Sequence, residues 1–413
     1  MQFSKWNRVV SAAAAVLLAA GALYSCKHKD GGNHSGIKQT DAPLSAPIET
    51  TVPTDAPTLE PTAIPTEAPT AEPTPEPTPE PTPVPLTVAF RDIELEREVK
   101  HDYFAIPEDV LKLMSEGDRE LYRRVAAAYF SYENEVEIPE GMEEHPNLWR
   151  VIDMYFPIFF ADVNDESIVE EGGAIRWEYE GSREDHEKTI ADFEIKVDEL
   201  LSPLVEGDTF IMQALTLYQH FTSVIEYNGF DINGVEQHGP SEVPFKYRHC
   251  VDAIMENTGV CWCFARAYNF LLCQIGAESL TVHGLRRGDS AIHEWTVFKY
   301  KDEWRYADPT WDLGGTTLDY FGFTRAVRKD NGYPDERVSV LEGEGIRASD
   351  HFKVDGTFFK PLYTGECSGS RYELDHEGGQ IVFFMTQLDA YGSPMREEPV
   401  SVFNTETGEA KEF

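Results

Sequence analysis

Two cysteines, Cys261 and Cys263, stand one residue apart at the start of an apolar run that continues to Ile275. Three roles are open to such a pair: metal ligands, partners in a disulfide, or a single nucleophilic thiol. In a helix, successive residues lie about 100° apart around the axis, so Cys263 lies about 200° from Cys261. The two thiols therefore cannot converge on one atom, which argues against a shared metal site and against a disulfide between them.

Cys261 is the better candidate for a reactive thiol. Gly259 and Val260 fit a turn that leads the chain into a helix and leaves Cys261 in its first turn. The unpaired N–H groups and the positive dipole end of that turn favour a thiolate. Cys261 also shares one helical stripe with apolar residues, namely Phe264, Ala265, Tyr268, Leu271, Leu272 and Ile275. A small buried hydrophobe is therefore the alternative reading of Cys261, and the commoner fate of such a cysteine.

A base and its orienting group are predicted on the hairpin that follows. If Lys301-Asp302 is a two-residue turn, the cross-strand pairs are Tyr300 with Glu303, Phe298 with Arg305, and Trp295 with Asp308. His293 and Asp308 then share one face as diagonal neighbours, about 7–8 Å apart at the backbone. A carboxylate there would fix the imidazole tautomer, so that the other nitrogen can serve the thiol.

The alternative interpretation of these two residues is structural. His293 can be a satisfied strand histidine, and Asp308 can be a turn former before Pro309. The face that carries His293 also carries Trp295, Val297 and Tyr306. We expect these three side chains to pack against the apolar stripe of the Cys261 helix.

The elements around these residues indicate an α+β protein. Helical spacing of apolar residues predicts helices within 107–133 and 183–204, and a third over 209–227 that Asp208 caps and Asn228-Gly229 stops. Segment 174–181 is the one clear strand of this half. After the Cys261 helix, alternation within 279–315 predicts a three-stranded antiparallel meander, and 380–413 predicts two further strands.

Three motifs in this order resemble the transglutaminase-like superfamily, a branch of the papain-like thiol enzymes. They are Gly259-Val260-Cys261 before an aromatic and small-residue helix, His293-Glu294-Trp295, and Asp308-Pro309-Thr310-Trp311-Asp312. Flanks typical of bacterial members are similar to 227–231 and to Tyr320–Thr324. The resemblance covers roughly residues 208–324. It implies a core in which a nucleophile helix packs on an antiparallel β meander.

The resemblance also implies roles for single residues. Cys261 would be the nucleophile, His293 the general base and acid, and Asp308 the orienting group, with Asp312 as an alternative carboxylate. Three tryptophans are candidates for substrate contacts: Trp262, Trp295 and Trp311. For Trp295 and Trp311 the alternative, and the commoner role of such residues, is core packing. Two residues depart from the pattern: Glu294, where many bacterial members have a small residue, and Cys263, where glycine is frequent. These departures leave the shape of the acyl pocket open.

Two functions from different classes follow. The first is a thiol enzyme that acts on peptide or carboxamide bonds through an acyl-enzyme, either as a peptidase or amidase or as a protein-crosslinking acyltransferase. The second is a non-catalytic binding or scaffold module of the cell envelope on the same fold. We expect a peptide or protein substrate, no cofactor and no metal.

The N-terminal residues predict export. A basic start precedes an uncharged apolar run, residues 9–23, which is the length of a signal-peptide core. Leu23-Tyr24-Ser25-Cys26 resembles the lipobox of bacterial lipoproteins, in which the cysteine carries the lipid. We therefore expect a lipoprotein on the extracellular face of the bacterial membrane with Cys26 lipidated, or a secreted protein if the signal peptide is simply cleaved.

Composition divides the chain into five predicted regions. Residues 1–26 form the signal segment, 27–86 a disordered Pro/Thr/Glu-rich spacer, 87–205 a mainly helical region, 206–330 the transglutaminase-like core, and 331–413 a β-rich extension. The chain has 35 Lys and Arg against 73 Asp and Glu, a net charge of −38. Because no basic stripe can pair with phosphates, a nucleic-acid partner is excluded.

Overall fold

The computed structural model describes residues 85–227, 249–288, 292–339, 347–389 and 394–413. The expected signal segment, Cys26, nearly all of the spacer and the Asn228-Gly229 stop lie outside these residues. The described residues belong to one structural unit, Val84–Phe413. None of its described helices is both long and apolar enough to cross a membrane.

The centre of the unit is an antiparallel sheet in the order β10-β6-β7-β8-β9. Its strands are β6 (Ser279–Leu285), β7 (Ile292–Tyr300), β8 (Glu303–Ala307), β9 (Phe321–Phe323) and β10 (Glu336–Val338). The predicted meander corresponds to β6, β7 and β8. It is one part of a larger sheet, because β9 and β10 come from segments without clear strand alternation.

The predicted hairpin register is confirmed over most of its length. Tyr300 pairs with Glu303 and Phe298 with Arg305. Lys301 and Asp302 have φ values of 51° and 59°, as a two-residue type I′ turn requires. The ladder ends at the pair Thr296–Ala307, one step before the expected Trp295–Asp308 pair. The Asp308 N–H donates instead to the carbonyl of Tyr320, at 2.9 Å.

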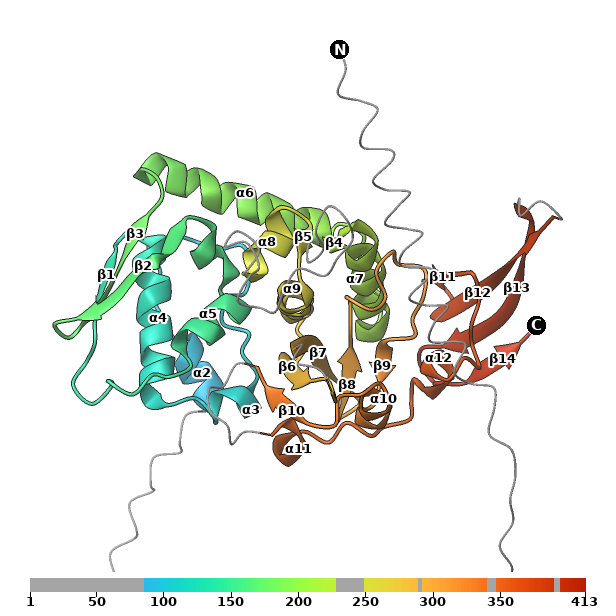
Figure 1. Cartoon of the computed structure of the whole chain (residues 1–413). Helices are drawn as coiled ribbons and strands as arrows, with labels where there is room; N and C mark the ends of the chain where they lie inside the picture. Colours follow the sequence, from blue (N-terminus) through green and yellow to red (C-terminus); the bar gives the residue numbers. More distant parts are fainter. Residues whose placement is uncertain (1–84, 228–248, 289–291, 340–346, 390–393) are drawn as a thin grey trace, which may run out of the picture. The chain divides into compact units, whose positions relative to one another are not determined.

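Helices cover both faces of the central sheet (Figure 1). On one face lie α7 (Phe210–Val224) and α9 (Cys261–Gln274), and on the other lie α10 (Arg325–Asp330) and α11 (Ala348–His351). The Thr296 hydroxyl donates to the Ala265 carbonyl of α9 at 2.8 Å, so even positions of β7 face α9. Trp295 therefore points to the opposite face, which α10 covers. There its ring packs against the ring of Tyr306 from β8, with the ring centroids 5.8 Å apart. The predicted packing of this face against the Cys261 helix is wrong, because alternation shows which residues share a face but not which helix covers it.

The N-terminal region is mainly helical, and it also contains a small three-stranded sheet. Its helices are α2 (Leu86–Arg91), α3 (Glu108–Leu111), α4 (Glu116–Phe130), α5 (Leu148–Tyr155), the 3-10 turn η1 (Pro157–Ala161) and α6 (Arg183–Leu201). A further short helix, α8 (Cys250–Met255), comes later in the chain. A sheet in the order β1-β3-β2 consists of β1 (Glu135–Glu137), β3 (Ala174–Tyr179) and β2 (Val163–Glu171). Alternation found only β3, since β2 is an exposed, charged edge strand.

Capping explains two further differences from the predicted helices. Ser115 and Asp118 form a capping box, which starts α4 there and divides the segment 107–133 into two helices. The N-cap of α7 is Thr209, whose hydroxyl accepts from the Met212 N–H at 3.4 Å. Asp208, the predicted cap, instead lies 2.7 Å from Nδ1 of His376.

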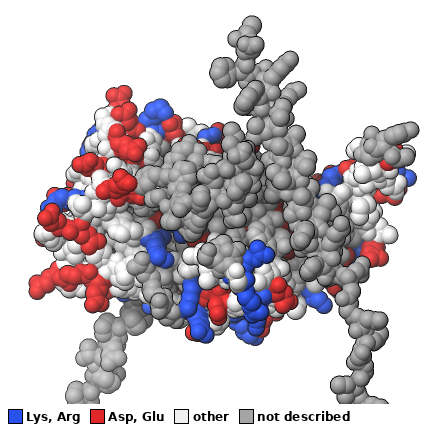
Figure 2. Space-filling model, viewed as in Figure 1, with Lys and Arg blue, Asp and Glu red and all other residues white. Residues whose placement is uncertain are grey.

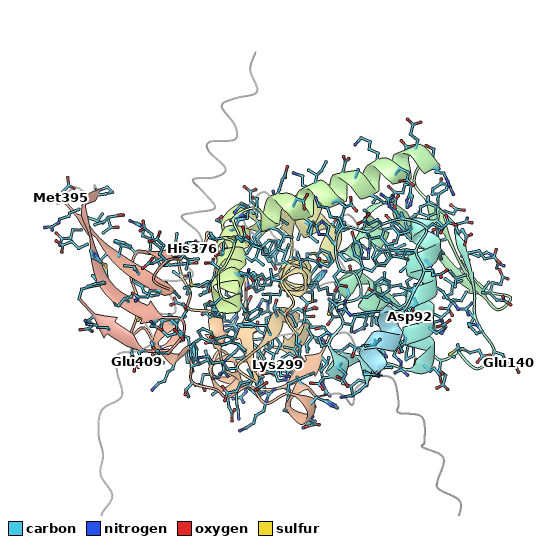
Figure 3. All side chains as sticks on the ribbon, turned by 180° about the vertical axis from the view of Figure 1, so that it is seen from behind. Asp92, Glu140, Lys299, His376, Met395 and Glu409 are labelled. Atoms are coloured by element: carbon cyan, nitrogen blue, oxygen red, sulfur yellow. The ribbon has the colours of Figure 1, made fainter. Side chains whose placement is uncertain are left out.

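The C-terminal residues contribute to two sheets. β10 completes the central sheet, so part of the expected extension belongs to the core. After α12 (Lys360–Tyr363), a four-stranded sheet contains β11 (Arg371–Asp375), β12 (Gln380–Leu388), β13 (Pro394–Asn404) and β14 (Ala410–Glu412). Residues 380–413 thus hold three strands where two were expected. Figure 3 shows His376 where this sheet meets the start of α7, and Met395 at its far end.

Charged side chains lie mainly on the surface of the unit. On the face shown in Figure 2, Asp and Glu gather over the N-terminal elements, and several Lys and Arg lie near the lower centre. The exceptions matter more for function, because a few charged residues are buried: among them Asp153, Glu294, Asp308, Asp312 and Arg328.

Candidate active site

Cys261 is the first residue of α9. The chain reaches it through β5 (Thr258–Gly259), which pairs in parallel with β4 (Glu226–Tyr227), and through the extended N-cap residue Val260. A Cβ on Gly259 would lie 2.6 Å from the Cβ of Cys263, so only glycine fits this approach. Cys261 is 4% exposed, and its Sγ lies 4.0 Å from the Ile292 carbonyl oxygen at the start of β7.

His293 and Asp308 form the hydrogen bond that the hairpin register predicted. Nε2 of His293 lies 2.6 Å from Oδ2 of Asp308, which leaves Nδ1 for the thiol. Burial opposes the charge of the imidazole, but the Asp308 charge and its hydrogen bond, with a hydrogen bond to Cys261, raise the pKa of His293 to about 9. His293 is therefore held by Asp308 on one side and lies beside Cys261, in the place that a base for the thiol requires.

Asp308 is completely buried and is held by a second cation, Arg328 of α10. Nη2 of Arg328 donates to Oδ2 at 2.6 Å, and the Thr310 N–H donates to Oδ1 at 3.1 Å. Burial raises the pKa of Asp308, but His293 and Arg328 outweigh it and hold that pKa below its usual value. Sequence reasoning missed Arg328, because its segment, RAVRKD, is the polar turn of a short helix beyond the resemblance.

Two of the three tryptophans expected at the substrate stack on His293. The imidazole lies 5.4 Å from the Trp311 ring and 5.9 Å from the Trp295 ring, at interplanar angles of 20° and 29°. Trp295 is completely buried and so belongs to the core beneath His293 rather than to a substrate surface. Trp311 and Trp262 are half-buried, the first over His293 and the second beside Cys261 on α9.

Glu294, the departure noted after His293, belongs to a buried ion-pair network. Arg266 of α9 makes a bidentate pair with Glu294, with both N–O distances at 2.9 Å, and its Nη1 pairs with Asp153 of α5. The Thr281 hydroxyl donates to Glu294 at 2.6 Å. The network ties the nucleophile helix to the strand that carries His293 and to the N-terminal region.

Asp312, the alternative orienting carboxylate, has other partners. Its Oδ2 lies 2.8 Å from the Tyr218 hydroxyl and accepts from the Tyr320 N–H at 3.0 Å, while Oδ1 accepts from the Thr317 hydroxyl at 2.7 Å. No hydrogen bond joins it to His293 among the described residues. Burial raises the pKa of Asp312 to about 7, above the opposing effect of these hydrogen bonds. Asp312 therefore shapes the loop after Asp308.

Replacing Asp312 with asparagine is expected to remove a pH dependence of stability. The pKa of the folded-state carboxyl is about 7 and its ordinary value is 3.8, so the unfolded chain loses this proton first and stability falls as pH rises between these values. Asparagine cannot ionise, and its oxygen can still accept from Tyr218 and Tyr320. Urea unfolding of both proteins across this range measures the difference. If the free energy of unfolding depends equally on pH in both proteins, a group other than Asp312 is responsible for that dependence.

The remaining cysteines offer no second site. Among the described residues, Cys250, Cys261, Cys263, Cys273 and Cys367 are all buried, and none of them forms a disulfide. Within the described ranges, no group of three His, Cys, Asp or Glu side chains could hold a metal ion.

Comparisons with known proteins find likeness in structure only. No protein-family model and no curated protein matches the chain. One similar solved structure is a TGase, with 13% sequence identity over 35% of this chain and 43% of that chain, at a TM-score of 0.25. A candidate cysteine protease from Cytophaga hutchinsonii has 16% identity over 29% of this chain and 37% of that chain, at a TM-score of 0.22. A candidate protease from Parabacteroides distasonis has 11% identity over 43% of this chain and 39% of that chain, at a TM-score of 0.23. The chain spans less than half of each of these structures, so the function proposed below rests on the geometry of the site.

Proposed function

We propose that the protein is a thiol enzyme of the transglutaminase-like type, acting on peptide or carboxamide bonds through an acyl-enzyme. The observation that carries this proposal is one linked set of side chains: Cys261 at the start of α9, close enough to His293 to raise the pKa of the imidazole, and Asp308, which lies 2.6 Å from His293. A nucleophile, a base and an orienting carboxylate in contact are the minimum that such chemistry needs. A binding module has no need of a buried imidazole that is held by a carboxylate beside a cysteine.

Acylation uses each member of this set once. The Cys261 thiolate attacks the amide carbonyl and forms the S–C bond of a tetrahedral intermediate. As the first residue of α9, Cys261 has an N–H without an acceptor in the helix, and this N–H is the proposed donor to the oxyanion. His293 gives its Nδ1 proton to the departing nitrogen, the C–N bond breaks, and an amine or ammonia leaves behind a thioester.

The thioester is then resolved by water or by a primary amine. His293, now neutral, takes a proton from the attacking group, the S–C bond breaks, and the thiolate returns. Water gives a peptidase or amidase, and a lysine-type amine gives a crosslinking transferase. We favour hydrolysis. With Cys26 lipidated and the Pro/Thr/Glu-rich segment as a spacer, the enzyme would act at the extracellular face of the membrane.

Cysteine alkylation tests the proposal directly. The full chain is labelled with iodoacetamide over a range of pH, each cysteine is read by mass spectrometry, and a His293→Ala variant is treated in parallel. Cys261 is expected to label selectively, at a pH well below about 8, where an ordinary thiol is mostly protonated. Because the imidazole supplies that reactivity, the variant should lose it.

Cys273 is the internal control for this experiment, since it lies on the same helix and burial raises its pKa far above the usual value. Labelling of Cys261 no faster than that of Cys273 in the folded protein would contradict the proposal. If Cys261 is reactive, a glutamine-containing peptide with and without an added primary amine distinguishes hydrolysis from transfer by the product formed.

A further inference from the structure

Arg328 is a buried cation in contact with the proposed site. Its side chain is 0% exposed, and its guanidinium carbon lies 4.3 Å from the Trp295 ring centroid, 4.5 Å from Trp311 and 4.7 Å from Phe323. Nη2 donates to Asp308, whereas Nε and Nη1 have no hydrogen-bond partner among the residues that the structure describes. Aromatic faces thus surround most of this guanidinium. Within the described part of the chain, Asp308 is its one ion-pair partner.

Arg328 and His293 converge on the same oxygen atom. Oδ2 of Asp308 lies 2.6 Å from Nη2 of Arg328 and 2.6 Å from Nε2 of His293. Trp295 and Trp311 contact both cations, by stacking on the imidazole and by facing the guanidinium. Any change at Arg328 therefore acts on His293 through a shared carboxylate and two shared rings.

Charge balance indicates what Arg328 contributes. With Arg328 and Asp308 both charged, the buried set is neutral when Cys261 and His293 are a thiol and an imidazole, and equally neutral when they are a thiolate and an imidazolium. The proton can then move between sulfur and nitrogen without changing the net charge. Without Arg328, both of these forms carry a net charge of −1 in a buried site, which is costly.

We propose that Arg328 is a positioning residue of this site, which neutralises Asp308 so that His293 can give up its proton and serve as a base. This inference rests on the proposed function. If the arginine is replaced by a neutral side chain, Asp308 has His293 as its sole counter-ion. The imidazolium is then held in place with a protonated Cys261, and the thiolate forms only at higher pH.

The groups that face His293 come from four parts of the fold. They are Cys261 from α9, Asp308 after β8, Arg328 from α10, and Tyr333, whose ring lies 5.7 Å from the imidazole. Burial raises the pKa of Tyr333 to about 12, so this phenol stays neutral over the range tested. The Glu294 and Arg266 pair lies on the opposite face of β7 and is unchanged by the substitution.

The first test measures the titration of His293 without the nucleophile. In the full chain carrying Cys261→Ala, isotope-labelled histidine side chains are followed by NMR against pH, and a His293→Gln sample assigns the resonance. Adding Arg328→Met or Arg328→Gln is expected to move the His293 titration upward by about 1–3 pH units. Arg328→Lys keeps the charge and should leave the titration within about one unit of its original value.

The second test measures alkylation of Cys261 in the chain that retains it. The rising limb of its pH profile is expected to move to higher pH in Arg328→Met and Arg328→Gln, and to stay near its original position in Arg328→Lys. Arg305→Met is the matched control. Arg305 is also 0% exposed and lies in the same sheet, but it pairs with Glu303 and does not touch the site. Arg305→Met shows how much the loss of a buried arginine destabilises the fold. We expect it to change neither the His293 titration nor the pH profile of Cys261 alkylation.

The outcomes separate this inference from the proposed function. A His293 titration that is unchanged in Arg328→Met and Arg328→Gln, or that moves equally in Arg305→Met, would overturn the role of Arg328. If Arg328→Met does not fold, Arg328→Gln and Arg328→Lys still give the comparison. Should the titration move while Cys261 is unreactive in every protein, the role of Arg328 stands and the proposed function fails.

Discussion

Asp308→Asn is expected to lower the rate of Cys261 alkylation at neutral pH, and any amidase activity, by about 10²–10⁴-fold. All three neighbours of the Asp308 carboxylate are donors: Nε2 of His293, Nη2 of Arg328 and the Thr310 N–H. An asparagine has one acceptor oxygen and must turn its NH₂ group toward one of these donors. If it faces His293, the imidazole proton moves to Nδ1, and the base can no longer take a proton from the thiol.

Asp312→Asn is the matched control for this substitution. It changes the other buried aspartate of the same loop in the same way, and we expect no change in Cys261 alkylation. Circular dichroism and thermal unfolding of both variants report whether the fold is kept. Equal loss of reactivity in the two variants would mean that the loop as a whole, rather than the Asp308 to His293 contact, supports the thiol.

Arg266→Met is expected to destabilise the fold by about 3–5 kcal/mol, because it leaves the Asp153 and Glu294 carboxylates buried without their cation. Urea unfolding at neutral pH measures the change in free energy. Burial raises the pKa of Asp153, but Arg266 and His249 outweigh it and lower that pKa to about 2. In the unchanged protein this stabilisation is therefore present above pH 3.8 and is lost as pH falls toward 2. Without Arg266 the buried carboxylates bind protons instead. The loss of unfolding free energy relative to the unchanged protein should therefore be smaller at low pH.

Arg176→Met is the control for the Arg266 prediction. Arg176 makes the same bidentate contact with a glutamate, Glu135, at 2.9 and 2.8 Å, but both side chains are about half exposed. Exposed pairs of this kind contribute little to the free energy of unfolding, because water screens them. A loss in Arg266→Met as small as that in Arg176→Met would show that water reaches the network.

Local patterns predicted the parts of the site that one segment forms by itself. The helix that begins at Cys261 follows from the apolar spacing after Gly259. The shared face of His293 and Asp308 follows from strand alternation and from the even length of the Lys301-Asp302 turn, because each residue added to a hairpin turn moves one strand to the other face. The structure contains both features.

Alternation could not predict what covers each face of the sheet. The side with Trp295 and Tyr306 packs against α10 rather than against α9, because even positions of β7 contact Ala265 and Arg266. Strands such as β2 and β10 were missed, since an exposed edge or a three-residue strand has no apolar period to detect. Thr209 and not Asp208 caps α7, a choice that depends on the contact of Asp208 with His376 from the C-terminal sheet.

The sequence by itself determined the chemistry that is available: a thiol at the first turn of a helix, and an imidazole and a carboxylate on one face of a hairpin. Those features depend on neighbours only a few residues apart, which helix and strand periods describe. Only the tertiary structure decided which side chains converge, because Cys261, Asp308 and Arg328 meet through the packing of three separate elements on one sheet. It placed Arg328 on the oxygen that His293 also uses, and it paired Glu294 with Arg266, where the sequence showed only a polar segment and an unexpected glutamate.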